Sequence, residues 1–452
     1  MALTQRKIRQ DIFRMVWPAT MESVLQFTVG IVATAMVGRL GAVSIGAVGL
    51  SQRLLQTVWA LSQAVTVGAT VLVAQAYGAG RRDAAGRSAR QSLLVALFGS
   101  AAFTLAVLAG PSRLLGLFHP TADVLGVAVG YLRIVAWGVP FTMLMLVIGS
   151  IMRGAGDTRT PLSIAILVNV VNVAGNYLLI FGHLGFPALG VRGSAVATLV
   201  AQATGVLVAG YLLFTPGPRF GLRFCASWRP DVAEFRRLLG IGVPAAAESL
   251  AWQFAAVLLT ILIVSFGTVA LAAHTLGIQA EGLSYMPAAG FAIASTTLVG
   301  QSLGARDPGL ARRYTAETAR WAGYMTLMTT AALVFFPATV MGFLTNDQAV
   351  VGLGAKYLRL MGLAQLPQQL GGVLNGALRG SGDTRSPMLI AFAGLWLIRL
   401  PLAFLLGRHF GLGIIGVWVA MTLDLFVRYG LIHLTYVRRQ RGFASRAADL
   451  GQ

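Results

Sequence analysis

Long runs of apolar residues make up most of this chain, and they constrain its fold more than any other feature. Twelve runs are long enough to cross about 30 Å of hydrocarbon as helices, which rise about 1.5 Å per residue. Only 11% of the 452 residues are charged, against about 25% in an ordinary soluble domain, so a fully water-exposed surface is excluded. The sequence therefore predicts an all-α integral membrane protein with twelve transmembrane helices. The predicted spans lie near residues 12–38, 44–76, 92–111, 123–149, 161–181, 194–214, 238–266, 271–300, 319–341, 350–376, 388–407 and 414–436.

The basic residues indicate how these spans are oriented. Lys and Arg number 35 against 15 Asp and Glu, which gives a net charge of +20. Most arginines fall in every second predicted loop and in the C-terminal tail, and cytoplasmic loops of membrane proteins carry such an excess. We therefore expect both termini in the cytoplasm. Because the basic excess reports topology, nucleic acid is not an expected partner.

The sequence repeats itself at an offset of 226 residues. The segment R-G-A-G-D-T-R-T-P at 153–161 returns as R-G-S-G-D-T-R-S-P at 379–387, and the same offset maps Glu22 onto Glu248. Six predicted spans lie in each period, and an even number returns the chain to its starting side. The sequence thus predicts two six-helix lobes in parallel orientation, related by an axis along the membrane normal.

The repeat also sets the expected domain boundaries. We predict an N-terminal lobe at 1–214, a cytoplasmic linker at 215–237, a C-terminal lobe at 238–437 and a basic cytoplasmic tail at 438–452. The linker is rich in Pro and Arg and contains the single cysteine, Cys225. Parallel six-span lobes are typical of alternating-access transporters, whose substrate site lies near the membrane midplane.

Several motifs together resemble the multidrug and toxic compound extrusion (MATE) transporter family over roughly residues 10–440. They are W-P-A-T-M-E at 17–22, M-V-G-R-L-G at 36–41, V-A-Q-A-Y-G-A-G at 73–80, the two R-G-x-G-D-T-R elements, A-A-H at 272–274 and L-V-G-Q-S-L-G-A at 298–305. The spacing of Pro244 and Glu248 looks more like the DinF-like branch than like the other branches.

This resemblance implies a multi-pass antiporter of the inner membrane that exports cationic or amphipathic compounds in exchange for protons or sodium. Small-molecule substrates and membrane lipid are the implied partners, a monomer is expected, and no cofactor is expected besides the coupling ion. One departure is notable. Relatives often place acids at N-lobe positions that hold Ala33 and Asn176 here.

Four carboxyl groups inside the predicted spans are candidates for cation or proton coupling: Glu22, Glu248, Glu281 and Asp424. Each costs several kcal/mol at membrane depth unless it is paired, hydrated or protonated. Glu22 and Glu248 lie about ten residues into their spans, which places them near the midplane. As isolated carboxyls they could act by protonation alone. Alternatively they fix helix packing, and Asp424 pairs with Arg428 one turn on.

Other residues on the same helix faces are candidates for hinges or contacts. Pro18 and Pro244 cannot donate to the preceding helical turn, so we predict hinges there. Gln26 continues the face of Glu22 in the first span. Trp252 continues the face of Glu248, where its ring could stack on a flat cation.

Polar side chains in the fifth and eleventh spans are candidate substrate or ion ligands. Asn169, Asn172 and Asn176 put three amides on one helix face, where they could bind sodium or substrate or join helices. Arg399 is the one arginine placed deep within a span. Asp157 and Asp383 precede the prolines that open the next spans and are expected to act as turn and cap residues.

These features together predict a secondary active multidrug efflux antiporter, with proton coupling favoured over sodium because the N-lobe lacks the usual acids. Two alternatives are a lipid-linked precursor flippase and, less favoured, a membrane transferase acting on lipid. A flippase cavity needs cationic side chains for pyrophosphate, of which Arg399 is the only deep one. No catalytic or metal motif indicates an enzyme.

Overall fold

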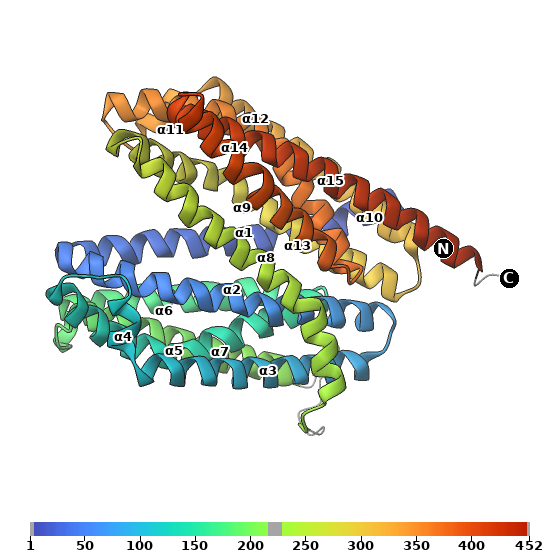
Figure 1. Cartoon of the computed structure of the whole chain (residues 1–452). Helices are drawn as coiled ribbons and strands as arrows, with labels where there is room; N and C mark the ends of the chain where they lie inside the picture. Colours follow the sequence, from blue (N-terminus) through green and yellow to red (C-terminus); the bar gives the residue numbers. More distant parts are fainter. Residues whose placement is uncertain (1–3, 216–227, 450–452) are drawn as a thin grey trace. The chain divides into compact units, whose positions relative to one another are not determined.

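The computed structural model describes residues 4–215 and 228–449, and every regular element in these ranges is a helix (Figure 1). The all-α fold and the repeated order of elements predicted from sequence are confirmed. Cys225 lies outside the described residues. The long helices of the first half are α1 (Gln5–Gly38), α2 (Ala42–Gly78), α3 (Arg82–Ala109), α5 (Ala122–Gly154), α6 (Arg159–Phe181) and α7 (Val191–Phe214).

The second half repeats this order. Its long segments are α8 (Val232–Val264), α9 (Thr268–Gly304), α10 (Pro308–Phe335), α12 (Gln348–Gly380), the continuous run α13 (Arg385–Phe392), η2 (Ala393–Arg399), α14 (Leu400–Phe404) and η3 (Leu405–His409), and α15 (Gly413–Asp449). Short helices α4 (Pro111–Gly116) and α11 (Pro337–Gly342) and the turn η1 (His183–Gly185) complete the described elements. Gly41 and Gly267 precede α2 and α9 with the same φ of 100°, a conformation that favours glycine.

Nine of the described helices are long and apolar enough to cross a membrane. The three other long segments are α9, α10 and α12, all in the second half. Each of these helices buries polar side chains, including Glu281 on α9, Glu317 on α10 and Gln365 on α12. The second half therefore keeps the order of six long helices found in the first half while placing ionisable groups in its interior.

The chain divides into two compact units that exchange helix ends. One unit is Met21–Ala246, called here the N-unit, and the other is Met1–Thr20 with Ala247–Gln452, called the C-unit. The changes of unit, after Thr20 in α1 and after Ala246 in α8, lie 226 residues apart. Each repeat therefore gives the first half of its first helix to the other unit.

The exchanged helix halves approach their hosts at repeat-related positions. In the N-unit, a Cβ added to Gly242 of α8 would lie 1.5 Å from the carbonyl oxygen of Ala64 in α2. In the C-unit, a Cβ on Gly290 of α9, the counterpart of Ala64, would lie 2.5 Å from Thr20 Oγ1 in α1. One glycine at each crossing, on opposite partners, permits this close approach.

Polar contacts hold the exchanged helix ends, and they use equivalent residues of the host helices α10 and α3. In the C-unit, Arg9 Nε donates to Glu317 Oε1 at 2.7 Å, and Tyr314 donates to Asp11 at 2.8 Å. In the N-unit, the counterpart of Glu317 is Gln91. Its amide donates to the carbonyl of Arg229 at 2.8 Å and accepts from the backbone N–H of Asp231 at 3.1 Å, while Ser88, the counterpart of Tyr314, donates to Glu234.

Candidate functional site

Glu22 and Glu248 each form an ion pair with the first arginine of a repeated motif. Arg153 Nη1 lies 3.2 Å from both carboxylate oxygens of Glu22, and Arg379 Nη2 lies 2.7 Å from Glu248 Oε2. The partners are 131 residues apart in both cases, so the repeat reproduces the pair. The expectation that these two carboxyls are isolated is wrong, because sequence spacing does not reveal that the arginines in the last turns of α5 and α12 turn inward.

The inward course of Arg153 has a local cause. It stands in the last turn of α5, and a Cβ on Gly149, one turn earlier, would lie 3.2 Å from its Nη1. The missing side chain lets the arginine fold back along its own helix. A terminal arginine of a membrane helix normally extends toward the polar interface, so this inward course indicates a specific partner.

The remainder of each repeated motif opens the next helix. Asp157 Oδ1 accepts from the backbone N–H groups of Arg159 and Thr160 at 3.0 and 3.1 Å. Asp383 Oδ1 accepts from the backbone N–H of Ser386 at 3.0 Å. These bonds confirm the predicted turn and cap roles of the two aspartates.

Glu281 lies in a buried hydrogen-bond network between α9 and α12. Tyr357 donates its hydroxyl to Oε2 and Gln365 donates its amide to Oε1, each at 2.7 Å. Gln369 in turn donates to Gln365 at 3.1 Å. Among the buried carboxyls of the described residues, Glu281 is the one with no basic side chain within ion-pair distance.

Asp424 is fully buried on α15 and is shared by two arginines. Arg399 Nε lies 2.8 Å and Arg428 Nη2 lies 2.9 Å from its Oδ2. The predicted alternative of an Asp424–Arg428 pair is therefore confirmed, with Arg399 as an additional partner. Arg399 ends the π-helical segment η2, and π-helical turns often reposition side chains at functional sites.

Aromatic groups connect to the Glu281 network. Trp418 Nε1 donates to His274 Nδ1 at 3.3 Å, and the Tyr357 ring meets both rings edge-on, with centroids 5.6 Å from His274 and 5.2 Å from Trp418. His274, Tyr357 and Gln365 were not predicted as site residues. The repeat contained a signal for two of them, because their counterparts are the apolar Val48 for His274 and Val139 for Gln365.

The N-unit has a neutral polar chain on its fifth and sixth long helices. Asn176 donates to Asn172 at 3.0 Å, and Asn172 donates to Thr198 at 3.2 Å. Asn169 does not join this chain: its Nδ2 has no hydrogen-bond partner among the described residues. The structure therefore brings together two of the three predicted amides.

The remaining predicted residues lie on the helices that change unit. Pro18 and Pro244 are inside α1 and α8, each two residues before the change, and their hinge role stays a prediction. The side chains of Gln26 and Trp252 are exposed. The coupling roles of the four carboxyls also stay predictions.

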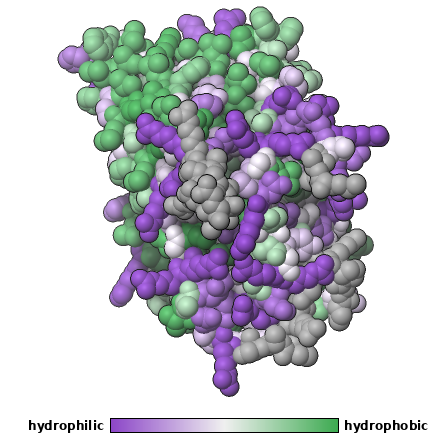
Figure 2. All heavy atoms as spheres, turned by 90° about the vertical axis from the view of Figure 1, so that its right-hand side faces the viewer, coloured by the Kyte–Doolittle hydropathy of each residue, from purple (hydrophilic) through white to green (hydrophobic). Residues whose placement is uncertain are grey.

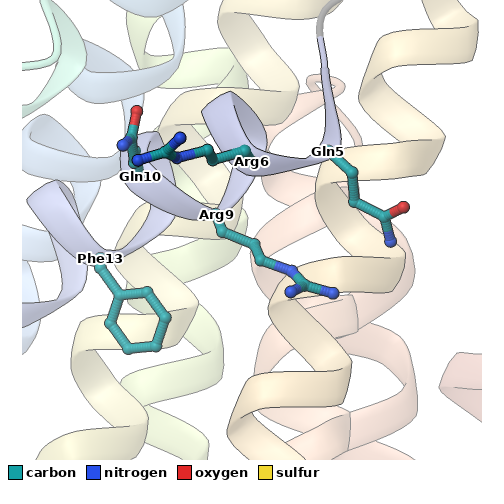
Figure 3. Close-up of a pocket in the computed structure, with 5 residues that line it drawn as sticks. All are labelled: Gln5, Arg6, Arg9, Gln10 and Phe13. Carbon is teal, nitrogen blue, oxygen red and sulfur yellow. The ribbon is translucent and has the colours of Figure 1, made fainter.

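A separate hollow of about 380 Å³ lies beside the start of α1 (Figure 3). It is lined by Gln5, Arg6, Arg9, Gln10 and Phe13 and contains none of the predicted site residues. In the described part of the chain, no group of three or more His, Cys, Asp or Glu side chains could hold a metal ion.

Comparison with known proteins identifies the family. The chain matches the MatE family model over residues 18–178 and 244–405, two segments that begin 226 residues apart. The probable multidrug resistance protein NorM of Thermotoga maritima is 33% identical, over 93% of this chain and 90% of the relative. The uncharacterized transporter YisQ of Bacillus subtilis is 26% identical, over 96% of both chains.

A solved structure has the same fold. An outward-facing multidrug resistance MATE family transporter of the MOP superfamily superposes with a TM-score of 0.90 over 97% of each chain, at 21% identity. The expected resemblance to the DinF-like branch stays a prediction. The family match over most of the chain, together with the repeated apolar helices, shows that this protein belongs to the MATE family of multi-pass membrane transporters that carry out multidrug efflux.

Proposed function

We propose that the protein is a secondary antiporter that exports cationic or amphipathic organic compounds through the inner membrane in exchange for protons, by alternating access. Both termini are assigned to the cytoplasm, and the protein works as a monomer surrounded by membrane lipid. The names of its relatives support the cargo class. Hydrophilic side chains cover much of the face shown in Figure 2. This supports the assignment of that face to water at the membrane surface.

The observation that carries proton coupling is the environment of Glu281. Glu22, Glu248 and Asp424 each have an arginine at 2.7–3.2 Å, whereas Glu281 is held by a phenol and an amide. Protonation of an ion-paired carboxylate would leave its arginine in the interior without a counter-charge, which is costly. Glu281 is therefore the carboxyl of the four that is best placed to bind and release a proton.

Protonation of Glu281 would change the net charge of the groups around it. Arg399 lies within electrostatic range of Glu281 and shares the carboxylate of Asp424 with Arg428. With Glu281 deprotonated these four charges balance, and with Glu281 protonated one positive charge remains. A low-dielectric interior makes that difference large enough to favour different conformations of the transporter.

The same arrangement does not favour a flippase. An anionic pyrophosphate cargo needs unpaired cationic side chains, whereas Arg399 and Arg428 are bound to Asp424. Arg153 and Arg379 are likewise paired with Glu22 and Glu248. Sodium coupling is also disfavoured, because the N-unit chain of Asn172, Asn176 and Thr198 offers neutral oxygens and no carboxylate. A sodium ion there would lose its hydration without meeting a negative charge.

Efflux of ethidium from proteoliposomes tests this function, with the pH and sodium gradients imposed separately. We expect the pH gradient alone to drive efflux, and Glu281→Gln to abolish it. Asp347→Asn is a matched control, because Asp347 is an exposed cap of α12, the helix that carries Gln365, and Asn can also cap a helix. Efflux that requires sodium and ignores pH, or that persists in Glu281→Gln, would contradict the proposal.

A further inference from the structure

The repeated Glu–Arg pairs are more open than the Asp424 cluster. Side-chain exposure is 15% for Glu22 and 14% for Arg153, and 15% for Glu248 and 27% for Arg379. At the Arg399–Asp424 pair these values are 9% and 0%. Arg428, the other partner of Asp424, is 16% exposed, so the clear difference lies in the carboxylates: those of the repeated pairs are partly exposed, whereas Asp424 is fully buried.

The repeated pairs also leave much of the bonding capacity of each arginine unused. A guanidinium has five N–H donors that can bind a carboxylate through two parallel bonds. Arg379 reaches Glu248 through Nη2 alone, and its Nε has no hydrogen-bond partner among the described residues. Arg153 uses the single Nη1 for both oxygens of Glu22, at the longer distance of 3.2 Å. Such pairs neutralise the carboxylate without fully binding it.

Aromatic side chains accompany the pair in the C-unit. Trp252 follows Glu248 by one turn of α8 and is 53% exposed. Tyr285 on α9 is 56% exposed and lies within electrostatic range of both Glu248 and Arg379. In the N-unit, Trp59 occupies the repeat position of Tyr285 and is also exposed. A carboxylate beside exposed aromatic rings is the combination that recognises organic cations.

We propose that each Glu–Arg pair is a binding site for an organic cation, in which the arginine is a resident counter-ion that the cargo displaces. This inference rests on the proposed efflux of cationic compounds. A permanent cation takes the place of Arg379 at Glu248, or of Arg153 at Glu22. When the cargo leaves, the arginine returns, so the carboxylate is not left unpaired at membrane depth. The C-unit site binds more tightly because Trp252 and Tyr285 flank it.

Opposite effects of the two partners distinguish this role from a structural one. Binding of tetraphenylphosphonium to the purified full-length protein is measured by calorimetry in detergent at one pH, with neutral triphenylphosphine oxide as a comparison. We expect Glu248→Gln to weaken tetraphenylphosphonium binding about tenfold, and Arg379→Gln to strengthen it about fivefold, because the competitor is removed. Arg379→Lys keeps the competing charge and should bind as the wild type does.

Whether each variant folds decides which binding affinities are compared. If both Gln variants weaken binding, or neither changes it, the proposal is overturned and the pair is structural. If a Gln variant does not fold, Glu248→Asp and Arg379→Lys replace it. Glu248→Asp should then bind tetraphenylphosphonium with lower affinity than Arg379→Lys, and equal affinities would overturn the proposal.

The N-unit pair supplies a second test, in which Glu22→Gln should weaken binding and Arg153→Gln should strengthen it by smaller factors. Effects of the same sign would count against the proposal. If the wild type binds no tetraphenylphosphonium, the inference fails. The proposed function fails with it only if pH-driven ethidium efflux is also absent.

Discussion

The two units place different chemistry at one position of the same fold. Thr198 in α7 of the N-unit and Asp424 in α15 of the C-unit are repeat counterparts. Thr198 accepts from Asn172 in a neutral chain, whereas Asp424 binds two arginines. The repeat has kept the parts that shape the fold, such as the glycine crossings and the Glu–Arg pairs. It has diverged among the buried side chains, which carry no charge in the described residues of the N-unit and include Arg399 and Asp424 in the C-unit.

This difference assigns separate tasks to the two kinds of site. The Glu–Arg pairs are shared by both units, as expected for groups that act on cargo in both lobes. The Glu281 network and the Asp424 cluster belong to the C-unit, and the N-unit counterparts of these two carboxyls are Leu55 and Thr198. Proton coupling, in this view, is a property of one unit.

The largest expected effect comes from giving the C-unit cluster a residue of the N-unit. Asp424→Thr leaves Arg399 and Arg428 buried without their carboxylate, and we expect a loss of about 3–5 kcal/mol of stability. Thermal unfolding in detergent measures it. The triple variant Arg399→Val, Asp424→Thr, Arg428→Gln copies all three N-unit residues and should recover most of the loss, because buried ion pairs can often be replaced by neutral groups.

Transport by the triple variant sharpens the comparison further. If the charge balance in the C-unit is needed for coupling, this variant folds and binds tetraphenylphosphonium but no longer transports it in response to a pH gradient. Normal pH-driven efflux by the folded triple variant would show that the charged cluster is not part of coupling.

Substitutions of the glycines at the crossings of the exchanged helices should cause the next largest loss of stability. Gly242→Ala places a Cβ against the backbone oxygen of Ala64, which cannot rotate away, and we expect a loss of about 3 kcal/mol. Gly290→Ala places its Cβ 2.5 Å from Thr20 Oγ1, which can move, and 2.9 Å from the carbonyl oxygen of Val16, which cannot. Its loss should be smaller because this backbone contact is less close than the one at Gly242. Expression and unfolding temperature report both changes. Equal effects would show that the two crossings are not as different as their contacts indicate.

A smaller effect is expected in the neutral chain of the N-unit. Asn172→Ile introduces the residue found at the equivalent C-unit position, Ile398, and leaves Asn176 and Thr198 without their shared partner. We expect a loss of about 1–2 kcal/mol, the cost of unsatisfied buried polar groups. The pH dependence of efflux should not change. A switch of ion dependence in this variant would instead assign coupling to the N-unit.

Sequence patterns predicted the helices well because each depends on local composition. Apolar length gave the spans, and the 226-residue offset gave the repeated order of elements. Asp157 and Asp383 were assigned as caps because capping is a contact between near neighbours in the chain.

The partners of the buried charges could not be found in this way. Arg153 and Glu22 are 131 residues apart, and although Gly149 leaves room for the arginine along its own helix, the partner that the arginine reaches depends on helix packing. The change of unit after Thr20 likewise depends on contacts between segments that are far apart in the sequence. Only the folded structure shows that half of α1 packs with residues from the other end of the chain.

The smallest expected effect concerns how the exchanged helix ends are held. Glu317 precedes the predicted span 319–341 and binds Arg9 and Arg320, whereas its N-unit counterpart is the uncharged Gln91. Burial raises the pKa of Glu317, but the two arginines and the indole N–H of Trp321 lower it more, so the pKa is depressed overall. A carboxyl group whose pKa is lower in the folded than in the unfolded protein stabilises the fold at pH values above its unfolded-state pKa. This stabilisation is lost as the pH falls through the folded-state pKa.

Glu317→Gln makes the C-unit contact resemble the N-unit contact and should remove this pH dependence. The unfolding temperature of the wild type should fall on going from about pH 6 to below about pH 4, where carboxyl groups titrate. The fall should be smaller in Glu317→Gln, and Gln91→Ala should leave the wild-type slope unchanged, because Gln91 does not titrate. Parallel curves for wild type and Glu317→Gln would mean that the ionic contact between α1 and α10 contributes no more than the neutral contact between α8 and α3. Glu317 also pairs with Arg320 within α10, as an i, i+3 pair, and Arg9→Gln leaves that pair in place. Arg9→Gln should therefore reproduce only a fraction of the Glu317→Gln effect.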